Sequence, residues 1–228
     1  MPDPGIAYRN RLLLAATACG GLGVAAFAVD LPVAEWAARR PLPHALARLL
    51  YLLEIFGHGL GVTALFLALP ALDPSLRPWP SASSGSRRDI LRMAMAAAAG
   101  GLVVNLIKSV VERVRPHAAD LPALGSAFET FGTTALATAA TGTAETTGFP
   151  SGHAALAAGF ASALGWKYPH GRAVFAIFAA LVAAQRVISS DHFPSDVCIG
   201  LAFGLAAAAI VLGTDSPPPT RVAVRRPT

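Results

Sequence analysis

Long apolar stretches separated by short polar segments dominate the pattern of hydrophobic and polar positions along this chain. Six apolar stretches predict helices, at about residues 12–29, 45–72, 90–114, 151–166, 173–188 and 194–212. A helix that crosses a bilayer needs about 17 to 25 residues, and most of these stretches approach that length. The pattern therefore predicts an all-α, polytopic membrane protein, a six-transmembrane-helix bundle in a single domain over residues 1–228.

Two of the polar connections carry further predictions. Residues 31–43 are bounded by prolines and hold Trp36 and a pair of arginines, which is typical of a short interfacial helix. Residues 117–149 form the longest connection and contain no Lys or Arg, and we expect them to form an outer loop. We expect this loop to cover the site described below and to set its specificity. Its acidic residues are Asp120, Glu129 and Glu145.

Composition supports a membrane protein. Hydrophobic residues make up 54% of the 228, and the mean hydropathy of +0.54 is too high for a soluble chain. The net charge of +5 reflects loop arginines, so no nucleic-acid partner is expected. Cys19 and Cys198 lie in or beside apolar segments without metal-ligand spacing, which predicts neither a zinc site nor a disulfide. Because apolar residues continue past Cys19, we expect the first stretch to be a retained helix rather than a cleaved signal peptide.

The basic residues predict how the chain crosses the membrane. With the N-terminus in the cytoplasm, eleven basic residues lie inside and three outside, setting aside four near the outer ends of the third and fifth stretches. The end of the third stretch, the start of the fourth and the junction of the fifth and sixth then share the outer face. We therefore expect a protein of the cytoplasmic (inner) membrane whose site faces the periplasm or the outside.

A polar run at residues 185–196 interrupts the apolar C-terminal third. Buried charged side chains are costly unless they pair, hold a ligand or lie at a membrane boundary. Pro194 suits the first residue of a helix, so His192 precedes that helix and Asp196 lies in its first turn. A carboxylate there can orient the imidazole and leave its other ring nitrogen free to attack, accept a proton or bind a metal. The alternative is an ion-paired helix cap at the membrane surface.

Charged residues in two other stretches also share helix faces. Lys108 and Arg115 are seven residues apart, nearly two turns, so on a helix that ends at Pro116 they could bind one anion. Alternatively they extend to the lipid headgroups, which is the role that we expect for Arg113. In the second stretch Glu54 and His58 lie four residues apart and therefore on one helix face, and we expect them to make contacts between helices rather than to support residues of the site or to relay protons.

Residues 150–153, Pro-Ser-Gly-His, predict a helix start. Ser151 suits the N-cap, Gly152 allows a close approach, and the free N–H groups of a helix N-terminus bind anions. The outer face then gathers this N-terminus and six polar side chains: Lys108, Arg115, His153, Arg186, His192 and Asp196. Positive charge, a nucleophile and an acid are what phosphoryl transfer requires.

Three blocks together resemble the tripartite signature of the type 2 phosphatidic acid phosphatase superfamily. The first reads Lys, six residues, Arg-Pro; the second Pro-Ser-Gly-His; the third Arg, five residues, His, three residues, Asp. Gln185 departs from the pattern, because the family usually has Ser there, although an amide can also donate a hydrogen bond to phosphate. The apolar segments separate this chain from the soluble vanadium haloperoxidases of the same superfamily.

The resemblance implies a membrane lipid phosphatase that forms a covalent phosphohistidine and uses neither a metal nor a cofactor. His192 would attack phosphorus, Asp196 would orient it, and His153 would protonate the leaving oxygen and later activate water. The phosphate would be held by Lys108, Arg115, Ser151, Gly152 and Arg186. The substrate would be a lipid phosphate or diphosphate drawn from the membrane lipids: phosphatidic acid, phosphatidylglycerol phosphate, undecaprenyl diphosphate or lipid A phosphate.

Two other functions are compatible with these residues. His153, His192 and Asp196 could bind a metal ion in a metal-dependent hydrolase, but three nearby cationic side chains disfavour a divalent ion. A transporter or a non-catalytic lipid-binding protein could use the ionisable residues as a relay. Relays place charges through the depth of the membrane, whereas few are expected at depth here.

Overall fold

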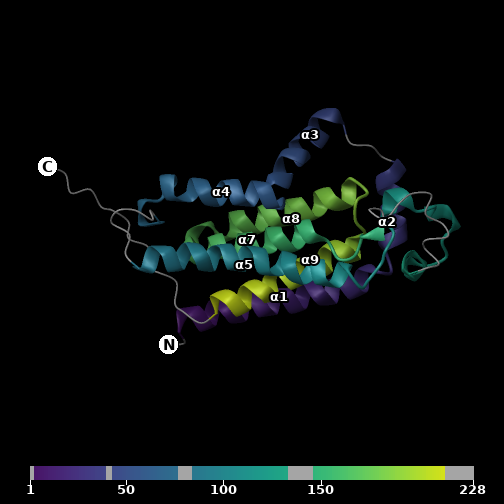
Figure 1. The fold of residues 1–228 in the computed structure, drawn as a ribbon. Helices are drawn as coiled ribbons and strands as arrows, with labels where there is room; N and C mark the ends of the chain where they lie inside the picture. The colour runs from purple at the N-terminus through teal and green to yellow at the C-terminus, as the bar shows by residue number, and fades with distance from the viewer. Residues whose placement is uncertain (1–2, 40–42, 77–83, 133–145, 214–228) are drawn as a thin grey trace.

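Helices form the long elements of the computed structural model, which describes residues 3–39, 43–76, 84–132 and 146–213 (Figure 1). The α-helices are α1 (Pro4–Ala26), α2 (Asp30–Arg39), α3 (His44–Leu53), α4 (Gly59–Leu72), α5 (Ser84–Lys108), α7 (Gly152–Lys167), α8 (Arg172–Ile188) and α9 (Pro194–Leu212). Short 3-10 turns lie between them: η1 (Glu54–Phe56), η2 (Pro74–Leu76), η3 (Pro116–Ala118), η4 (Leu121–Ala123), η5 (Ala127–Thr130) and η7 (Pro169–Gly171). The predicted all-α class is confirmed for the residues described.

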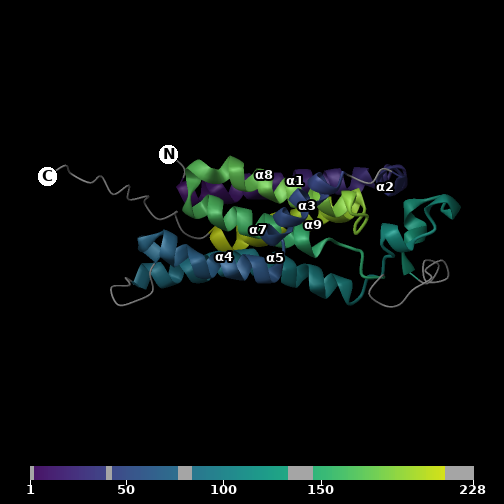
Figure 2. The ribbon, with the colours of Figure 1, turned by 90° about the horizontal axis from the view of Figure 1, so that it is seen from above.

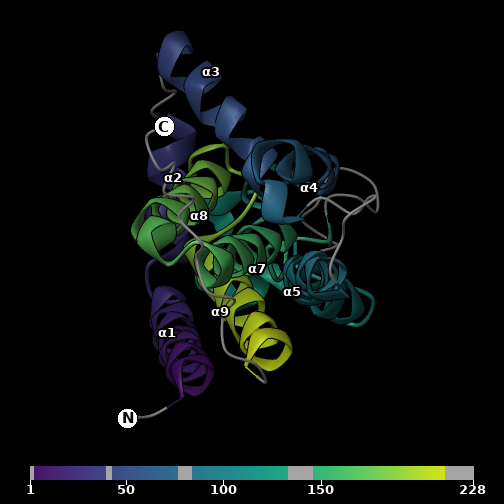
Figure 3. The ribbon, with the colours of Figure 1, turned by 90° about the vertical axis from the view of Figure 1, so that its left-hand side faces the viewer.

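Helix α7 lies at the centre of the bundle. It is built mainly from alanine, glycine and large apolar residues, so it can be buried on all sides. It packs against α5, α8 and α9, and α1 packs against α9 on the outside. Figures 2 and 3 both place α4 and α5 on one side of α7, and α1 and α8 on the other.

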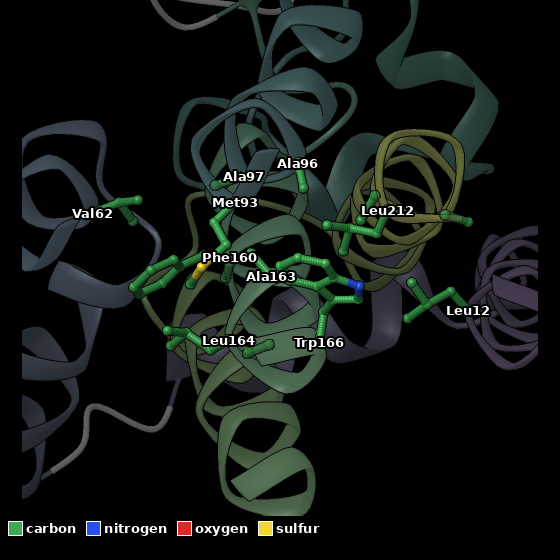
Figure 4. Packing of buried hydrophobic residues seen from close by; sticks show 14 of the residues in the cluster. Leu12, Val62, Met93, Ala96, Ala97, Phe160, Ala163, Leu164, Trp166 and Leu212 are labelled. Carbon is green, nitrogen blue, oxygen red and sulfur yellow. The ribbon is translucent and has the colours of Figure 1, made fainter. Parts of the chain in front are cut away.

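Two large side chains of α7 form the middle of the hydrophobic core (Figure 4). Phe160 and Trp166 are each 1% exposed. They pack in one cluster with Val62 of α4, Met93 of α5 and Leu212 of α9. This core joins α4 to α5, α7 and α9, so the helices around the site pack as one unit.

Small residues let the helix backbones touch. A Cβ atom on Gly204 of α9 would lie 2.2 Å from the carbonyl oxygen of Ala155 in α7. A Cβ atom on Gly100 of α5 would lie 2.6 Å from the Cα atom of Gly204. Such close approaches are typical of helices that pack within a membrane. They also hold α5, α7 and α9 in fixed positions relative to one another.

Some of the helices are long and apolar enough to cross a membrane. By length and composition, three single helices of the described chain qualify, at Ser86–Lys108, Pro169–Ile188 and Pro194–Leu212. Two bent pairs raise the number to five if each pair is one span: α1 with α2, at 79°, and Arg48–Phe56 with α4, at 63°. The prediction of an integral membrane protein is thereby supported, while the sixth span, over 151–166, stays a prediction. Helix α2 occupies most of the predicted interfacial segment.

The second predicted helix, 45–72, is wrong as a continuous element. It is broken into α3, the turn η1 and α4, with His58 in extended conformation before α4. Glycines at 57 and 59 weaken a helix at this point. Gly57 also lies against α7, because a Cβ atom on it would be 2.9 Å from the carbonyl oxygen of His153. The break therefore brings the chain into contact with the start of α7.

The third predicted helix, 90–114, is too long at its C-terminal end. Helix α5 ends at Lys108, and the backbone then leaves the helical path. The N–H groups of Arg113 and Val114 donate to the carbonyl oxygens of Thr146 and Thr130, at 2.8 and 2.9 Å. Valines favour extended backbone, and the residue before a proline avoids the helical conformation. The pairing with the loop replaces the expected last helical turns.

Candidate active site

Three segments that are distant in the sequence meet at the end of the bundle that carries α2 (Figure 1). The N–H of Ser151 donates to the carbonyl oxygen of Asp196, at 3.0 Å, which joins the second and third blocks. The ammonium of Lys108 donates to the carbonyl oxygen of Thr147, which joins the end of α5 to the same place. The structure thus brings the three predicted blocks together.

His192 is buried between α8 and α9, with 3% of its surface exposed. Its Nδ1 atom lies 2.7 Å from the carbonyl oxygen of Gly148. A carbonyl oxygen only accepts, so Nδ1 carries the proton and Nε2 keeps its lone pair. Burial lowers the pKa of His192 and the charge of Asp196 opposes that shift, so the net effect favours the neutral form of the imidazole.

Asp196 lies near His192 but is not its hydrogen-bond acceptor, whereas the sequence predicted a direct contact. Its Oδ2 atom is 3.7 Å from Nδ1 of His192, which is longer than a hydrogen bond. The same oxygen accepts from the N–H of Phe193, at 2.7 Å, and caps helix α9, whose first residue is Pro194 as expected. Gly148 is therefore the closer acceptor for His192, and Asp196 acts on it as a nearby charge.

Arg113 was expected to extend to the lipid headgroups, and that prediction is wrong. Its side chain is 0% exposed and bridges the carboxylates of Asp30, at 2.7 Å, and Asp196. Its guanidinium also lies over the rings of Phe193 and Phe131, 4.2 and 4.6 Å from their centroids. Burial of this charge is tolerated because two carboxylates and three aromatic rings, the third that of Phe27, surround it.

Two arginines of the predicted phosphate site are paired with carboxylates in this structure. Nη2 of Arg186 lies 3.1 Å from Glu54 and 3.5 Å from Asp191. Arg115 Nη1 lies 3.9 Å from Asp191. Gln185, the departure from the family pattern, accepts from Nε of Arg186 at 2.6 Å, so its amide oxygen orients the guanidinium.

Lys108 and Arg115 both lie at this end of the bundle, but the prediction that one helix face brings them together is wrong. They do not share a helix face, because α5 ends at Lys108 and Arg115 lies in extended backbone before η3. Lys108 is held by the Thr147 carbonyl, and Arg115 faces Asp191. Their approach depends on the chain turning back after α5 rather than on helical periodicity.

The start of α7 agrees with the sequence prediction. Ser151 is the N-cap, and its Oγ accepts from the N–H of Ala154 at 3.4 Å. Gly152 is the first helical residue and His153 follows it. Nε2 of His153 lies 3.2 Å from Oε1 of Glu54, without the alignment of a hydrogen bond.

The contacts between helices expected of Glu54 and His58 exist, but their partners are site residues. Glu54 contacts both His153 and Arg186. The ring of His58 lies 5.8 Å from that of His153, between centroids. Sequence spacing alone could not show this, because it depends on the break between α3 and α4.

The predicted outer loop contributes backbone to the site. The carbonyl oxygens of Thr147 and Gly148 hold Lys108 and His192. Sequence reasoning missed both, since a carbonyl leaves no signal in the sequence. Glu129 accepts from the N–H of Gly125, at 3.3 Å, within the loop. Residues 133–145, with Glu145, lie outside the described residues.

The geometry disfavours the alternative metal site. Among the described residues, no three His, Cys, Asp or Glu side chains lie close enough together to hold a metal ion. Asp196 uses one oxygen for Arg113 and the other for the cap of α9. The arrangement instead offers a neutral imidazole with a free Nε2, a second imidazole and cationic side chains, which suits an oxyanion such as phosphate.

Two curated proteins are similar to this chain in sequence. The chain is 35% identical over 104 residues to a lipid A 1-phosphatase of Rhizobium etli, and 34% over the same length to one of Rhizobium johnstonii. Each match covers 46% of this chain, and it spans about 40% of the first relative and 38% of the second.

Two solved structures share the fold. LpxE of Aquifex aeolicus matches with a TM-score of 0.58 at 20% identity, over 82% of this chain and 96% of that one. The phosphatidylglycerolphosphate phosphatase of Bacillus subtilis, a transmembrane PAP2 type enzyme, matches with a TM-score of 0.58 at 21% identity, over 91% and 94%. The model of the PAP2 superfamily matches residues 89–216, which hold all three blocks. The chain therefore belongs to the PAP2 superfamily, as its three blocks predicted.

Proposed function

We propose that this protein is an integral membrane lipid phosphatase that works through a phosphohistidine on His192 and needs no metal ion. The observation that carries the proposal is the state of His192. It is buried, which lowers its pKa and favours the neutral imidazole, and its Nε2 is left free by the bond from Nδ1 to Gly148. The cationic Lys108, Arg115 and Arg186 lie at the same end of the bundle.

The reaction has two halves. In the first, Nε2 of His192 bonds to phosphorus while the bond from phosphorus to the lipid oxygen breaks, and that oxygen takes a proton from Nε2 of His153. In the second, water bonds to phosphorus, the bond to His192 breaks, and His153 takes a proton from the water. Ser151 and Gly152 at the start of α7, with the three cationic residues, stabilise the charge on the phosphoryl oxygens.

The substrate that we propose is a lipid phosphomonoester or diphosphate. The curated relatives are lipid A 1-phosphatases, and one solved neighbour is a phosphatidylglycerolphosphate phosphatase. Lipid A 1-phosphate is therefore the first candidate and phosphatidylglycerol phosphate the second, ahead of phosphatidic acid and undecaprenyl diphosphate. We further propose that the chain crosses the cytoplasmic membrane six times, with the short α7 added to the five spans given above. We also propose that the site faces the periplasm or the outside.

Phosphate release from a panel of these four lipids, in detergent with a strong chelator, tests the proposal. Wild-type protein should release phosphate, and His192→Ala and His153→Ala should each lose about 100-fold or more in rate. His170→Ala serves as the control, because His170 is exposed in η7 beyond the far end of α7. With a radiolabelled phosphate and an alkaline quench, wild type but not His192→Ala should carry label on histidine. Activity that disappears in the chelator would support the metal-dependent alternative.

A further inference from the structure

Glu54 places a carboxylate inside the candidate site from a part of the chain that the family match does not cover. The matched residues are 89–216, and Glu54 lies in η1, between α3 and α4. Its Oε1 atom is 3.2 Å from Nε2 of His153, and its Oε2 atom is 3.1 Å from Nη2 of Arg186. Both partners have a role in the proposed reaction.

The fold, rather than a flexible side chain on the surface, sets the position of this carboxylate. Phe56, two residues later, is buried against Phe160 and Phe178, with ring centroids 4.7 and 5.5 Å apart. Gly57 lies so close to α7 that a Cβ atom would be 2.9 Å from the His153 carbonyl oxygen. The backbone of η1 is therefore anchored directly beside the residue that Glu54 contacts.

The charges around His153 explain why a carboxylate is needed there. Among the described residues, the titratable and charged groups that face it are Glu54 of η1, His58 before α4, Arg186 of α8, and Asp191 and His192 between α8 and α9. Burial, first, and the positive charge on Arg186, second, oppose a positive charge on the imidazole. Glu54 is in contact with His153, so it can balance the proton that a general acid must carry.

We propose that Glu54 is the positioning residue of the general acid, and that its carboxylate keeps the transferable proton on Nε2 of His153. The two atoms are close but not aligned for a hydrogen bond, so the proton remains available to the departing lipid oxygen. The inference rests on the proposed function and adds a residue to it. Glu54 acts through His153 and not on phosphorus itself.

A change of leaving group tests this role. An alcohol leaves as an alkoxide unless it is protonated, whereas p-nitrophenolate leaves without a proton, so only the alcohol needs the acid. For Glu54→Gln, kcat/KM should fall by about 10- to 100-fold on the lipid phosphomonoester that wild type hydrolyses fastest. On p-nitrophenyl phosphate it should fall by less than about threefold. Because kcat/KM covers only the steps through phosphoryl transfer, the later attack of water does not enter the comparison.

The controls separate this inference from the function on which it rests. Glu54→Asp should recover part of the lost rate on the lipid, and Glu35→Gln, which removes an exposed partner of Arg39 on α2, should leave both rates unchanged. An equal loss on both substrates would overturn the inference, because the contact would then serve binding or folding. A gain on both would also overturn it, since Glu54 would then compete with phosphate for Arg186. If wild type hydrolyses neither substrate, the proposed function itself fails.

Discussion

Arg113 connects the first helices of the chain to the end of the bundle that holds the candidate active site. It bonds to Asp30, Asp196 and Ser195, and Asp30 in turn accepts from the N–H of Ser195 at 2.9 Å. Its backbone carbonyl accepts from the N–H of Gly148, whose own carbonyl holds His192. Arg113 thus supports both the Gly148 carbonyl, which accepts from His192, and the carboxylate of Asp196, whose charge acts on His192.

Removal of Arg113 should destabilise the protein strongly. Arg113→Met leaves two buried carboxylates without their counter-charge, a change that costs about 3–5 kcal/mol. The expected result is a clear fall in the thermal unfolding midpoint in detergent, partly restored by adding Asp30→Asn. Arg39→Met, which breaks an exposed pair with Glu35, should cost less than about 1 kcal/mol. Equal midpoints for the two single variants would contradict the role given to Arg113.

The lowered pKa of His192 predicts how stability depends on pH. In the unfolded chain this imidazole has its ordinary pKa of about 6.5, whereas burial lowers its pKa in the folded protein. Below pH 6.5 the unfolded state therefore binds more protons, and stability falls as the pH falls. The contribution is at most about 1.4 kcal/mol per pH unit. Thermal midpoints measured at about pH 7.5 and 5.5 should fall further for wild type than for His192→Gln. An equal fall would contradict the pKa shift.

At the scale of elements, the sequence predicted where helices lie better than where they end. Apolar length identified α1, α5, α8 and α9, because burial or lipid on all sides needs a continuous apolar run. The end of α5 at Lys108 could not be read, since it depends on hydrogen bonds from Arg113 and Val114 to loop carbonyls. The break at η1 was signalled only by Gly57 and Gly59, and glycine is also common inside membrane helices.

Two neighbouring glycines of α5 offer a matched test of the helix packing. Gly100→Ala would place a Cβ atom 2.6 Å from Gly204 Cα and 3.2 Å from the Ala155 carbonyl oxygen, whereas a Cβ atom on Gly101 meets nothing within 4 Å. Alanine favours a helix over glycine by up to about 1 kcal/mol at either position. Gly101→Ala should therefore be neutral or stabilising. Gly100→Ala should destabilise by about 1–3 kcal/mol and lower activity, because it separates the helices that carry the site. If the two variants unfold at the same thermal midpoint, this packing is contradicted.

At the scale of the whole molecule, the sequence could predict the meeting of the three blocks but not the other residues that join them. The predicted crossing pattern places the end of α5, the start of α7 and the junction of α8 and α9 at one face, and the basic residues predict on which side of the membrane that face lies. No spacing rule connects Asp30 or Glu54 to residues more than 80 positions away, and both depend on bends in α1–α2 and α3–α4. The first 88 residues, outside the family match, thus supply two carboxylates, Asp30 and Glu54, to the candidate active site and its surroundings.

The direction in which this molecule crosses the membrane can be tested with two single cysteines at its opposite ends. Ala123 is exposed in η4 at the site end, and His170 is exposed in η7 beyond the other end of α7. With Cys19 and Cys198 replaced by alanine, Ala123→Cys should react with a membrane-impermeant maleimide in intact spheroplasts. His170→Cys should react only after the membrane is permeabilised, because Lys167 and Arg172 beside it favour the cytoplasmic side. The reverse labelling pattern would place the site in the cytoplasm, where it could not act on lipids of the outer leaflet.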